Sequence, residues 1–175
     1  MNSKVYFPNL EPSDFSISDK NTNSESLTYG EIFPSDFMNF MHTYIRNIPN
    51  PYMIDIGSGC GRLVEYVSKH GQFPVDGVEI DEKRYKKSIQ QKKFNTQYIY
   101  NDFENVDFSP YNILYCCNVC FDKKDNHRLY HKILKEFKGL CILFEKPKIF
   151  RNFFHKQYFV KTTWNLQQEV YLIFM

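Results

Sequence analysis

The chain has 175 residues, of which 42% are hydrophobic and 18% aromatic, which suits one globular domain and excludes a disordered or fibrous chain. Its 22 Lys and Arg residues against 20 Asp and Glu leave a net charge of +2, so any nucleic-acid-binding surface must be local. No apolar run is long enough for a membrane span or a signal peptide, and five cysteines favour reduced thiols over a disulfide framework. We therefore expect an intracellular, monomeric protein with no membrane partner.

The first part of the chain divides into two regions of different composition. Residues 1–28 are rich in Ser, Asn and Asp, and we expect a partly ordered N-terminal arm or lid there, followed by a domain over residues 29–175. Apolar residues at helical spacing predict a first helix that is capped by Ser35 and ends before Pro49. A buried strand over 52–56 then leads through a glycine turn to a helix over 62–70, with Gly71 as its C-cap.

The rest of the chain alternates strands and helices. We expect strands over 74–80, 96–100, 111–117 and 140–145, and helices over 81–93 and 125–137. Two last strands near 158–163 and 169–174, joined by a short link, predict a C-terminal antiparallel hairpin. Strands with near-continuous apolar runs, separated by helices, indicate an α/β, Rossmann-like fold with a seven-stranded, mostly parallel sheet and helices on both faces.

The turn after the first strand is the strongest motif. It reads Asp55-Ile56-Gly57-Ser58-Gly59-Cys60-Gly61. In a doubly wound sheet, ligands bind beyond the carboxyl ends of the strands, and glycines let the backbone approach a ligand closely. Because Arg62 follows the last glycine, the dinucleotide fingerprint GxGxxG is incomplete, which disfavours NAD and FAD. Asp55 can accept a hydrogen bond from an ammonium group of a ligand.

Polar and aromatic side chains also follow the next two strands. Glu79 ends the second strand and can bind both hydroxyls of a ribose, whereas Asp102 and Phe103 offer an acceptor for an exocyclic amine and a ring for a purine. An amino-acid head, a ribose and an adenine together describe S-adenosylmethionine, which we predict as the cofactor. The alternative is a structural glycine turn in some other α/β fold.

The glycine turn is similar to the first motif of class I S-adenosylmethionine-dependent methyltransferases, and its flanks narrow the match. The matching segments are Tyr29-Gly30-Glu31, the turn at Asp55, Gly77-Val78-Glu79, Asp102-Phe103, Asn118-Val119-Cys120-Phe121, Lys146-Pro147, and Trp164 with Tyr171. Together they resemble the disruptor-of-telomeric-silencing-like, non-SET family of histone lysine methyltransferases, over about residues 28–175. The resemblance implies the class I methyltransferase fold and N-methylation of a core histone lysine in nucleosomes. It also implies a nuclear or host-nuclear location, although no targeting signal is seen.

The resemblance assigns roles to individual residues. It implies that the cofactor is bound by Tyr29, Glu31, Asp55, Gly57, Ser58, Gly59, Gly61, Glu79, Asp102, Phe103 and Asn118. It also implies that a lysine channel is formed by Asn118, Phe121, Trp164 and Tyr171, which we predict as the catalytic residues. A narrow aromatic channel disfavours the charged ammonium, lowers the pKa of the lysine and aligns its nitrogen for transfer. The alternative for these aromatic residues is a place in the core.

Two alternative functions remain open at this stage. Amino-directed DNA and glutamine methyltransferases carry Asn-Pro-Pro-Tyr where this chain has Asn118 to Phe121, so amino-directed nucleic-acid or glutamine methylation is the alternative among enzymes, weakened by the missing prolines. A binding module that has lost turnover is the non-enzymatic alternative.

Residue spacing and local charge bear on metal binding and on nucleosome binding. Cys117, Cys120, His127 and His131 superficially suggest zinc, but the interval between the cysteine and histidine pairs is shorter than in zinc fingers, and we expect no metal. One basic stretch lies on the helix over 81–93. Another contains Lys148, Arg151 and Lys156, which we expect to contact nucleosomal DNA or an acidic histone surface.

Overall fold

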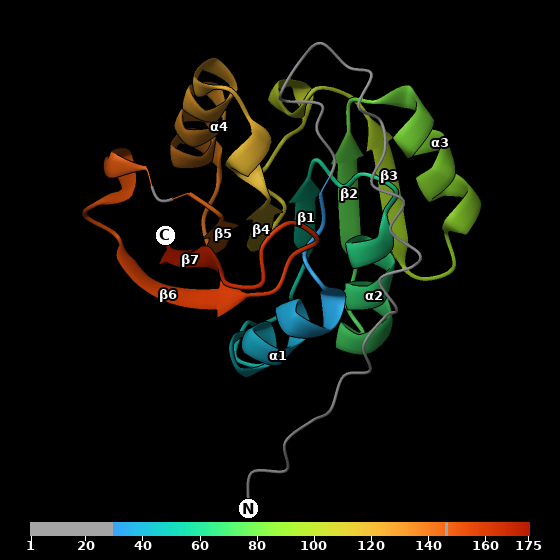
Figure 1. Cartoon of the computed structure of the whole chain (residues 1–175), viewed down its shortest axis with the longest axis horizontal. Coiled ribbons are helices and arrows are strands. Elements are labelled where there is room, and N and C mark those ends of the chain that lie inside the picture. The colour runs from blue at the N-terminus through green and yellow to red at the C-terminus, as the bar shows by residue number, and fades with distance from the viewer. Residues whose placement is uncertain (1–29, 146) are drawn as a thin grey trace, which may run out of the picture.

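The computed structural model describes residues 30–145 and 147–175, so the predicted arm over 1–28 and Tyr29 lie outside the described residues (Figure 1). The α-helices are α1 (Pro34–Ile45), α2 (Arg62–Gly71), α3 (Glu82–Gln91) and α4 (Lys123–Glu136). The strands are β1 (Met53–Ile56), β2 (Val75–Glu79), β3 (Thr96–Tyr100), β4 (Ile113–Cys116), β5 (Leu140–Leu143), β6 (Phe154–Val160) and β7 (Gln168–Phe174). Short 3-10 turns within these described residues are η3 (Phe103–Asn105), η4 (Asn118–Cys120) and η5 (Lys148–Phe150).

The seven strands form one sheet in the order β3-β2-β1-β4-β5-β7-β6. β1 pairs in parallel with β2 on one side and with β4 on the other, so the strand order reverses between β1 and β4. β7 lies antiparallel between β5 and β6, which confirms the predicted hairpin. This topology makes the carboxyl end of β1 the switch point at which ligands bind in open α/β sheets.

Two hydrophobic cores cover the two faces of the sheet. Along β4, Ile113 and Tyr115 join the core beneath α1 and α2, while Leu114 and Cys116 join the core beneath α4. This alternation follows from the two-residue period of a strand, and Figure 1 shows α1 and α4 on opposite sides of the sheet. Among the described residues, no helix has the length and apolar character that crossing a membrane requires.

Three local predictions about element ends are corrected by the structure. Ser35 does not cap α1: the N-cap is Phe33, and Pro34 occupies the first turn, where a missing N–H costs nothing. Gly71 is the last residue of α2 rather than its C-cap, and Gln72 takes the left-handed conformation there instead (φ 59°). β6 begins at Phe154, four residues before the predicted start, because pairing with β7 extends the hairpin to its full length.

Candidate functional site

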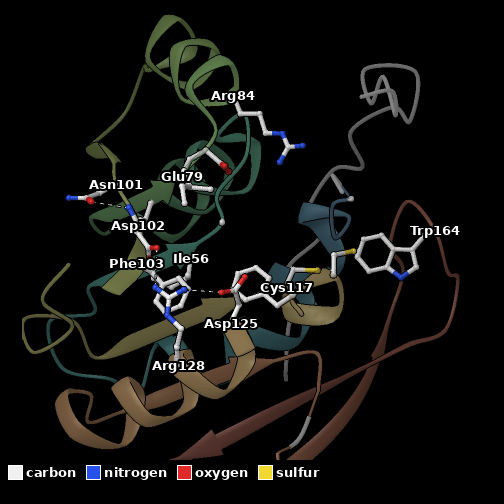
Figure 2. Close-up of a pocket in the computed structure, with 16 residues that line it drawn as sticks. Ile56, Glu79, Arg84, Asn101, Asp102, Phe103, Cys117, Asp125, Arg128 and Trp164 are labelled. Carbon is white, nitrogen blue, oxygen red and sulfur yellow. Dashed lines mark hydrogen bonds and ion pairs between the residues drawn. The ribbon is translucent and has the colours of Figure 1, made fainter. Parts of the chain in front are cut away.

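A cavity of about 320 Å³ opens at the carboxyl ends of the parallel strands, beside the switch point. Its volume falls in the range of small-molecule sites. Residues from several loops and from α4 line it: Gly30, Ile56, Gly57, Val78, Glu79, Ile80, Arg84, Asn101, Asp102, Phe103, Cys117, Cys120, Phe121, Asp125, Arg128 and Trp164. Figure 2 shows Trp164 and Cys117 on one side of the cavity, with Asp102, Phe103 and Arg128 on the other.

The glycine turn forms one wall of this cavity. Gly57, Gly59 and Gly61 all have positive φ (78°, 57° and 79°), a conformation that other residues rarely adopt. At Gly61 the packing also requires glycine, because a Cβ there would lie 2.7 Å from Cε1 of Tyr98. Gly57 lines the cavity, whereas Ser58, Gly59 and Gly61 are not among its lining residues.

Three acidic side chains gather beneath the glycine turn. Asp55 and Glu79 are only 2% and 4% exposed, and Glu31 is largely buried. Burial raises the pKa of the Glu31 carboxyl to about 7, with Arg62 opposing the rise. Burial, then the charges of Glu79 and Glu31, raises the pKa of Asp55 well above its ordinary value. Burial likewise raises the pKa of Glu79. The surroundings therefore do not fully neutralise the negative charge of these three carboxylates, which favours the binding of a cation.

Two buried polar atoms at this place have no hydrogen bond. Within residues 30–145 and 147–175, the buried side-chain oxygens without a partner are Oε2 of Glu31 and Oγ of Ser58. Nε of Arg62 lies 3.6 Å from the Glu31 oxygen, which is an ion pair but too long for a hydrogen bond. Buried polar groups are almost always satisfied, so these two acceptors without a donor are unusual in a folded chain. Neither Asp55 nor Glu31 is among the residues that line the cavity, so both would act on a ligand in it through charge.

Glu79 connects the cavity to two loops. One carboxylate oxygen accepts a hydrogen bond from the backbone N–H of Gly59 (2.7 Å), and the other accepts from the N–H of Asp81 (2.8 Å). These bonds fix the carboxylate at the cavity wall and hold the glycine turn against the end of β2. Each carboxylate oxygen can accept a second bond, so Glu79 retains capacity for a ligand hydroxyl.

The far end of the cavity is aromatic and charged. The ring of Phe103 lies near-parallel to that of Phe121, with centroids 6.1 Å apart and an interplanar angle of 21°. The guanidinium of Arg128 lies 5.5 Å from the Phe103 centroid and forms ion pairs with Asp102 (3.2 Å) and Asp125 (2.9 Å). Arg128 is a cavity residue that the sequence does not predict. Its partner Asp102 is 26 residues away along the chain, so no local sequence pattern indicates their contact.

The contacts of Asn118 favour a structural role over the predicted catalytic and cofactor-binding role. This side chain is fully buried and does not line the cavity. Its amide NH₂ donates to Oδ1 of Asn126 and to the hydroxyl of Tyr130, both at 2.7 Å. Its carbonyl oxygen accepts from the backbone N–H groups of Phe144 (3.0 Å) and Glu145 (3.3 Å). All four hydrogen-bonding positions are therefore used to join η4 to α4 and to the end of β5.

The structure brings together only part of the predicted lysine channel. Phe121 and Trp164 line the cavity, whereas Tyr171 lines a separate depression on the hairpin side, where its hydroxyl donates to Glu169 (2.6 Å). Phe144, which lines the depression, lies 6.2 Å, centroid to centroid, from Trp164, which lines the cavity. The depression is otherwise polar and is lined by Phe144, Glu145, Asn165, Gln167, Gln168, Glu169 and Tyr171.

Gly30 was quoted in the matching segment but not predicted as a site residue. It lines the cavity, and a Cβ at this position would lie 2.5 Å from Cε3 of Trp164. The backbone beside it is tied to the hairpin loop, since the N–H of Glu31 donates to Oγ1 of Thr163. The start of the described chain and the loop between β6 and β7 thus lie together at the cavity wall.

The cysteine and histidine residues that suggested zinc do not form a metal cluster. His127 and His131 lie side by side on α4, with ring centroids 4.2 Å apart. Across the described part of the chain, no group of three or more His, Cys, Asp or Glu side chains could hold a metal ion.

No family model and no curated protein sequence matches the chain, but solved structures are similar to it. An RNA methyltransferase from Salinibacter ruber, in complex with S-adenosylhomocysteine, is 13% identical, with a TM-score of 0.56 over 79% of this chain and 88% of its own. A magnesium protoporphyrin IX methyltransferase from Synechocystis PCC 6803, with bound S-adenosylmethionine, is 15% identical, with a TM-score of 0.61 over 80% of both chains. A proposed RNA methyltransferase from Pyrococcus horikoshii is 13% identical, with a TM-score of 0.62 over 90% and 91%.

At these identities the likeness concerns the fold. The seven-stranded sheet, with its switch point at β1 and its antiparallel β7, agrees with the architecture of these methyltransferases. None of the three structures described above is named as a histone methyltransferase. The chain has the class I methyltransferase fold.

Proposed function

We propose that the protein is an S-adenosylmethionine-dependent methyltransferase. The observation that carries this proposal is the group of three buried carboxylates beneath the glycine turn, with an oxygen of Glu31 that lacks a hydrogen bond. S-adenosylmethionine carries an ammonium and a sulfonium, and a cation of this kind would relieve the desolvation that raises the pKa of Glu31 and Asp55. Ligands of this chemistry in structures of the same fold support the proposal.

The residues present fit the cofactor in three places. Glu31 and Asp55 would compensate the ammonium, Glu79 would accept from the ribose hydroxyls, and Phe103 would stack on the adenine. When bound, S-adenosylmethionine supplies an electrophilic methyl group. The chain's own part is to orient the two reactants and to exclude water, which the apolar lining at Ile56 and Phe121 favours.

We propose that the methyl group is transferred to a lysine amine of a protein. More specifically, we propose that this protein is a core histone in nucleosomes. The support is the resemblance described above together with the aromatic side chains of Phe121 and Trp164 in the cavity wall. An aromatic wall disfavours the charged ammonium and so favours the neutral amine that can attack a methyl group. The hydroxyl of Tyr171 donates to Glu169, which leaves its oxygen available to accept from the amine.

The experiment is a radiolabelled methyl-transfer assay with reconstituted nucleosomes, free histone octamer, naked DNA and RNA side by side. Label on histone supports the lysine assignment, and label that requires intact nucleosomes supports the finer one. Tyr171→Phe should lower kcat while cofactor affinity stays unchanged. Its matched control is Tyr158→Phe, which removes a hydroxyl that is bonded to Tyr44 on α1, outside both hollows.

Nucleosome contact is proposed for Lys148, Arg151 and Lys156. All three side chains are exposed. Lys148 lies on η5, Arg151 directly follows η5, and Lys156 lies on β6, before the hairpin loop. Exposed cations of this kind bind phosphates with an affinity that falls steeply as salt rises. Charge reversal at all three should weaken nucleosome binding and flatten its salt dependence. Unchanged affinity would remove these residues from the interface.

The second candidate is methylation of an amino group of a nucleic acid or of a glutamine. The RNA methyltransferases among the similar structures favour the nucleic-acid form. Against it stand the missing prolines and the amide of Asn118, which is fully engaged by Asn126 and Tyr130 and does not reach the cavity. Label on RNA or DNA, with none on protein, would select this candidate.

A further inference from the structure

A concentration of positive charge lies on α3 and the residues that follow it. Between residues 81 and 93, six cations stand against two carboxylates, those of Asp81 and Glu82. The cations are Lys83, Arg84, Lys86, Lys87, Lys92 and Lys93, and the five lysines are exposed. This segment therefore carries +4, whereas the whole chain carries +2, so the remainder is net negative. A polyanion would be attracted to this face.

Apolar side chains are exposed on and beside the same segment. Ile80, Ile89 and Phe94 are exposed next to these lysines, and Tyr100 at the end of β3 is 52% exposed. A helix that is merely solvated has no need of exposed aromatic neighbours. Basic residues interleaved with aromatic ones are the composition of surfaces that bind single-stranded nucleic acids.

The aromatic part of the face is fixed in place. The ring of Tyr100 stacks on that of Tyr85 from α3, with centroids 5.3 Å apart and an interplanar angle of 27°. Tyr85 packs against the core beneath α1 and α2, so the outer ring rests on an anchored one. A ring that is held by its neighbour and open to solvent can stack on a base at little cost in conformational entropy. The faces of bases are accessible in single strands and hidden in duplexes.

We propose that α3 and the end of β3 form a binding surface for single-stranded RNA. The lysines would contact phosphates, and Tyr100 would stack on a base. Gln90 and Gln91 lie one turn beyond Lys86 and Lys87 and are exposed, so their amides can bond ribose 2′-hydroxyls, which DNA lacks.

The surface continues into the cavity. Arg84 lies on α3 and Ile80 just before it, and both line the cavity, as Figure 2 shows for Arg84. RNA bound along α3 would therefore lie beside the cavity mouth. This inference goes beyond the proposed function, because binding at this surface requires neither cofactor nor methyl transfer.

The test is fluorescence anisotropy of the full chain with a labelled single-stranded RNA of about 12 nucleotides, a length suited to one such surface. Arms with single-stranded DNA and double-stranded RNA of the same sequence accompany it. Lys83→Glu, Lys86→Glu and Lys87→Glu together should weaken RNA binding at least tenfold and reduce the slope of log affinity against log salt by about two. Tyr100→Ala should weaken it about tenfold. None of these four residues lines the cavity.

The matched control reverses three exposed lysines on α4: Lys123→Glu, Lys124→Glu and Lys135→Glu. It carries the same change in net charge and should bind RNA like the wild type. Equal weakening in the control, equal affinity for single-stranded DNA, tighter binding of duplex RNA, or binding that Tyr100→Ala leaves intact would each overturn the proposal. Binding of phosphatidylserine vesicles in place of RNA would overturn it too.

Cofactor binding, followed by the fluorescence of Trp164, separates this proposal from the proposed function. If a variant loses RNA binding but still binds the cofactor, its substitutions affect the RNA-binding surface alone. A wild-type chain that binds RNA but transfers no methyl group to any substrate would leave the surface standing and count against the proposed function.

Discussion

Replacing Glu31 by glutamine tests directly whether the buried carboxylates beneath the glycine turn carry negative charge that their surroundings do not neutralise. The pKa of this carboxyl is about 7 in the folded chain against an ordinary value of 4.5. At about 1.4 kcal/mol per pKa unit, an ionised Glu31 lowers the free energy of unfolding by about 3 kcal/mol at pH 8. Because the folded-state pKa is the higher one, the folded chain binds more protons between pH 4.5 and 7, and stability falls as the pH rises through that window.

Glu31→Gln removes the charge, keeps the shape and leaves the backbone bond to Thr163 in place. At pH 8 the variant should be more stable than the wild type by about 3 kcal/mol, and at pH 5 by much less, in urea unfolding without cofactor. Glu82→Gln is the matched control, since its carboxylate is exposed and paired with Lys86. Equal stability of wild type and Glu31→Gln at both pH values would refute the reasoning.

Glu31→Gln should weaken cofactor binding while it stabilises the folded chain. The attraction between the Glu31 charge and the ammonium would be lost, so we expect about a tenfold lower affinity for S-adenosylmethionine in titration calorimetry. In the wild type, binding should release protons at pH 6.5, because a bound cation lowers the raised pKa of Glu31, and the affinity should rise with pH up to about 7. Uptake of protons on binding, or affinity unchanged in the variant, would contradict this.

The remaining predictions concern the fold around the site. Asn118→Ala should lower the free energy of unfolding by about 3 kcal/mol or more in urea, because the partners that it leaves, Asn126 among them, are buried; a loss below about 1 kcal/mol would argue against the structural role. Gly30→Ala should displace Trp164, shift its fluorescence to longer wavelength and reduce cofactor affinity, since the added Cβ would lie 2.5 Å from the indole; an unchanged spectrum would contradict this packing. Arg128→Lys, which keeps the charge but not the planar fork, should weaken cofactor binding without unfolding the chain.

Part of the cavity could be predicted from the sequence because parallel strands end at one edge of a sheet. Glu79 ends a strand, Gly57, Asp102 and Phe103 follow one, and the structure brings all four to one cavity. Their roles toward a cofactor remain predictions.

Other parts of the site depend on contacts that no local pattern reports. The four partners of Asn118 come from η4, α4 and the end of β5, so its burial with every bond satisfied could not be predicted from a polar residue after an apolar strand. The family resemblance places Tyr171 with Trp164 in a lysine channel, but the hydroxyl of Tyr171 donates to Glu169, and Tyr171 lines the separate depression.

Strand and helix order, the place of the glycine turn and the seven-stranded class were set by the sequence itself, because apolar periodicity and glycine chemistry act over a few residues. The exact ends of the elements, the carboxylate pKa values and the shape of the cavity were decided by the tertiary structure. These depend on desolvation and on packing between distant segments, such as Glu31 with Thr163, 132 residues apart. Only the folded chain brings those segments together and removes the water between them.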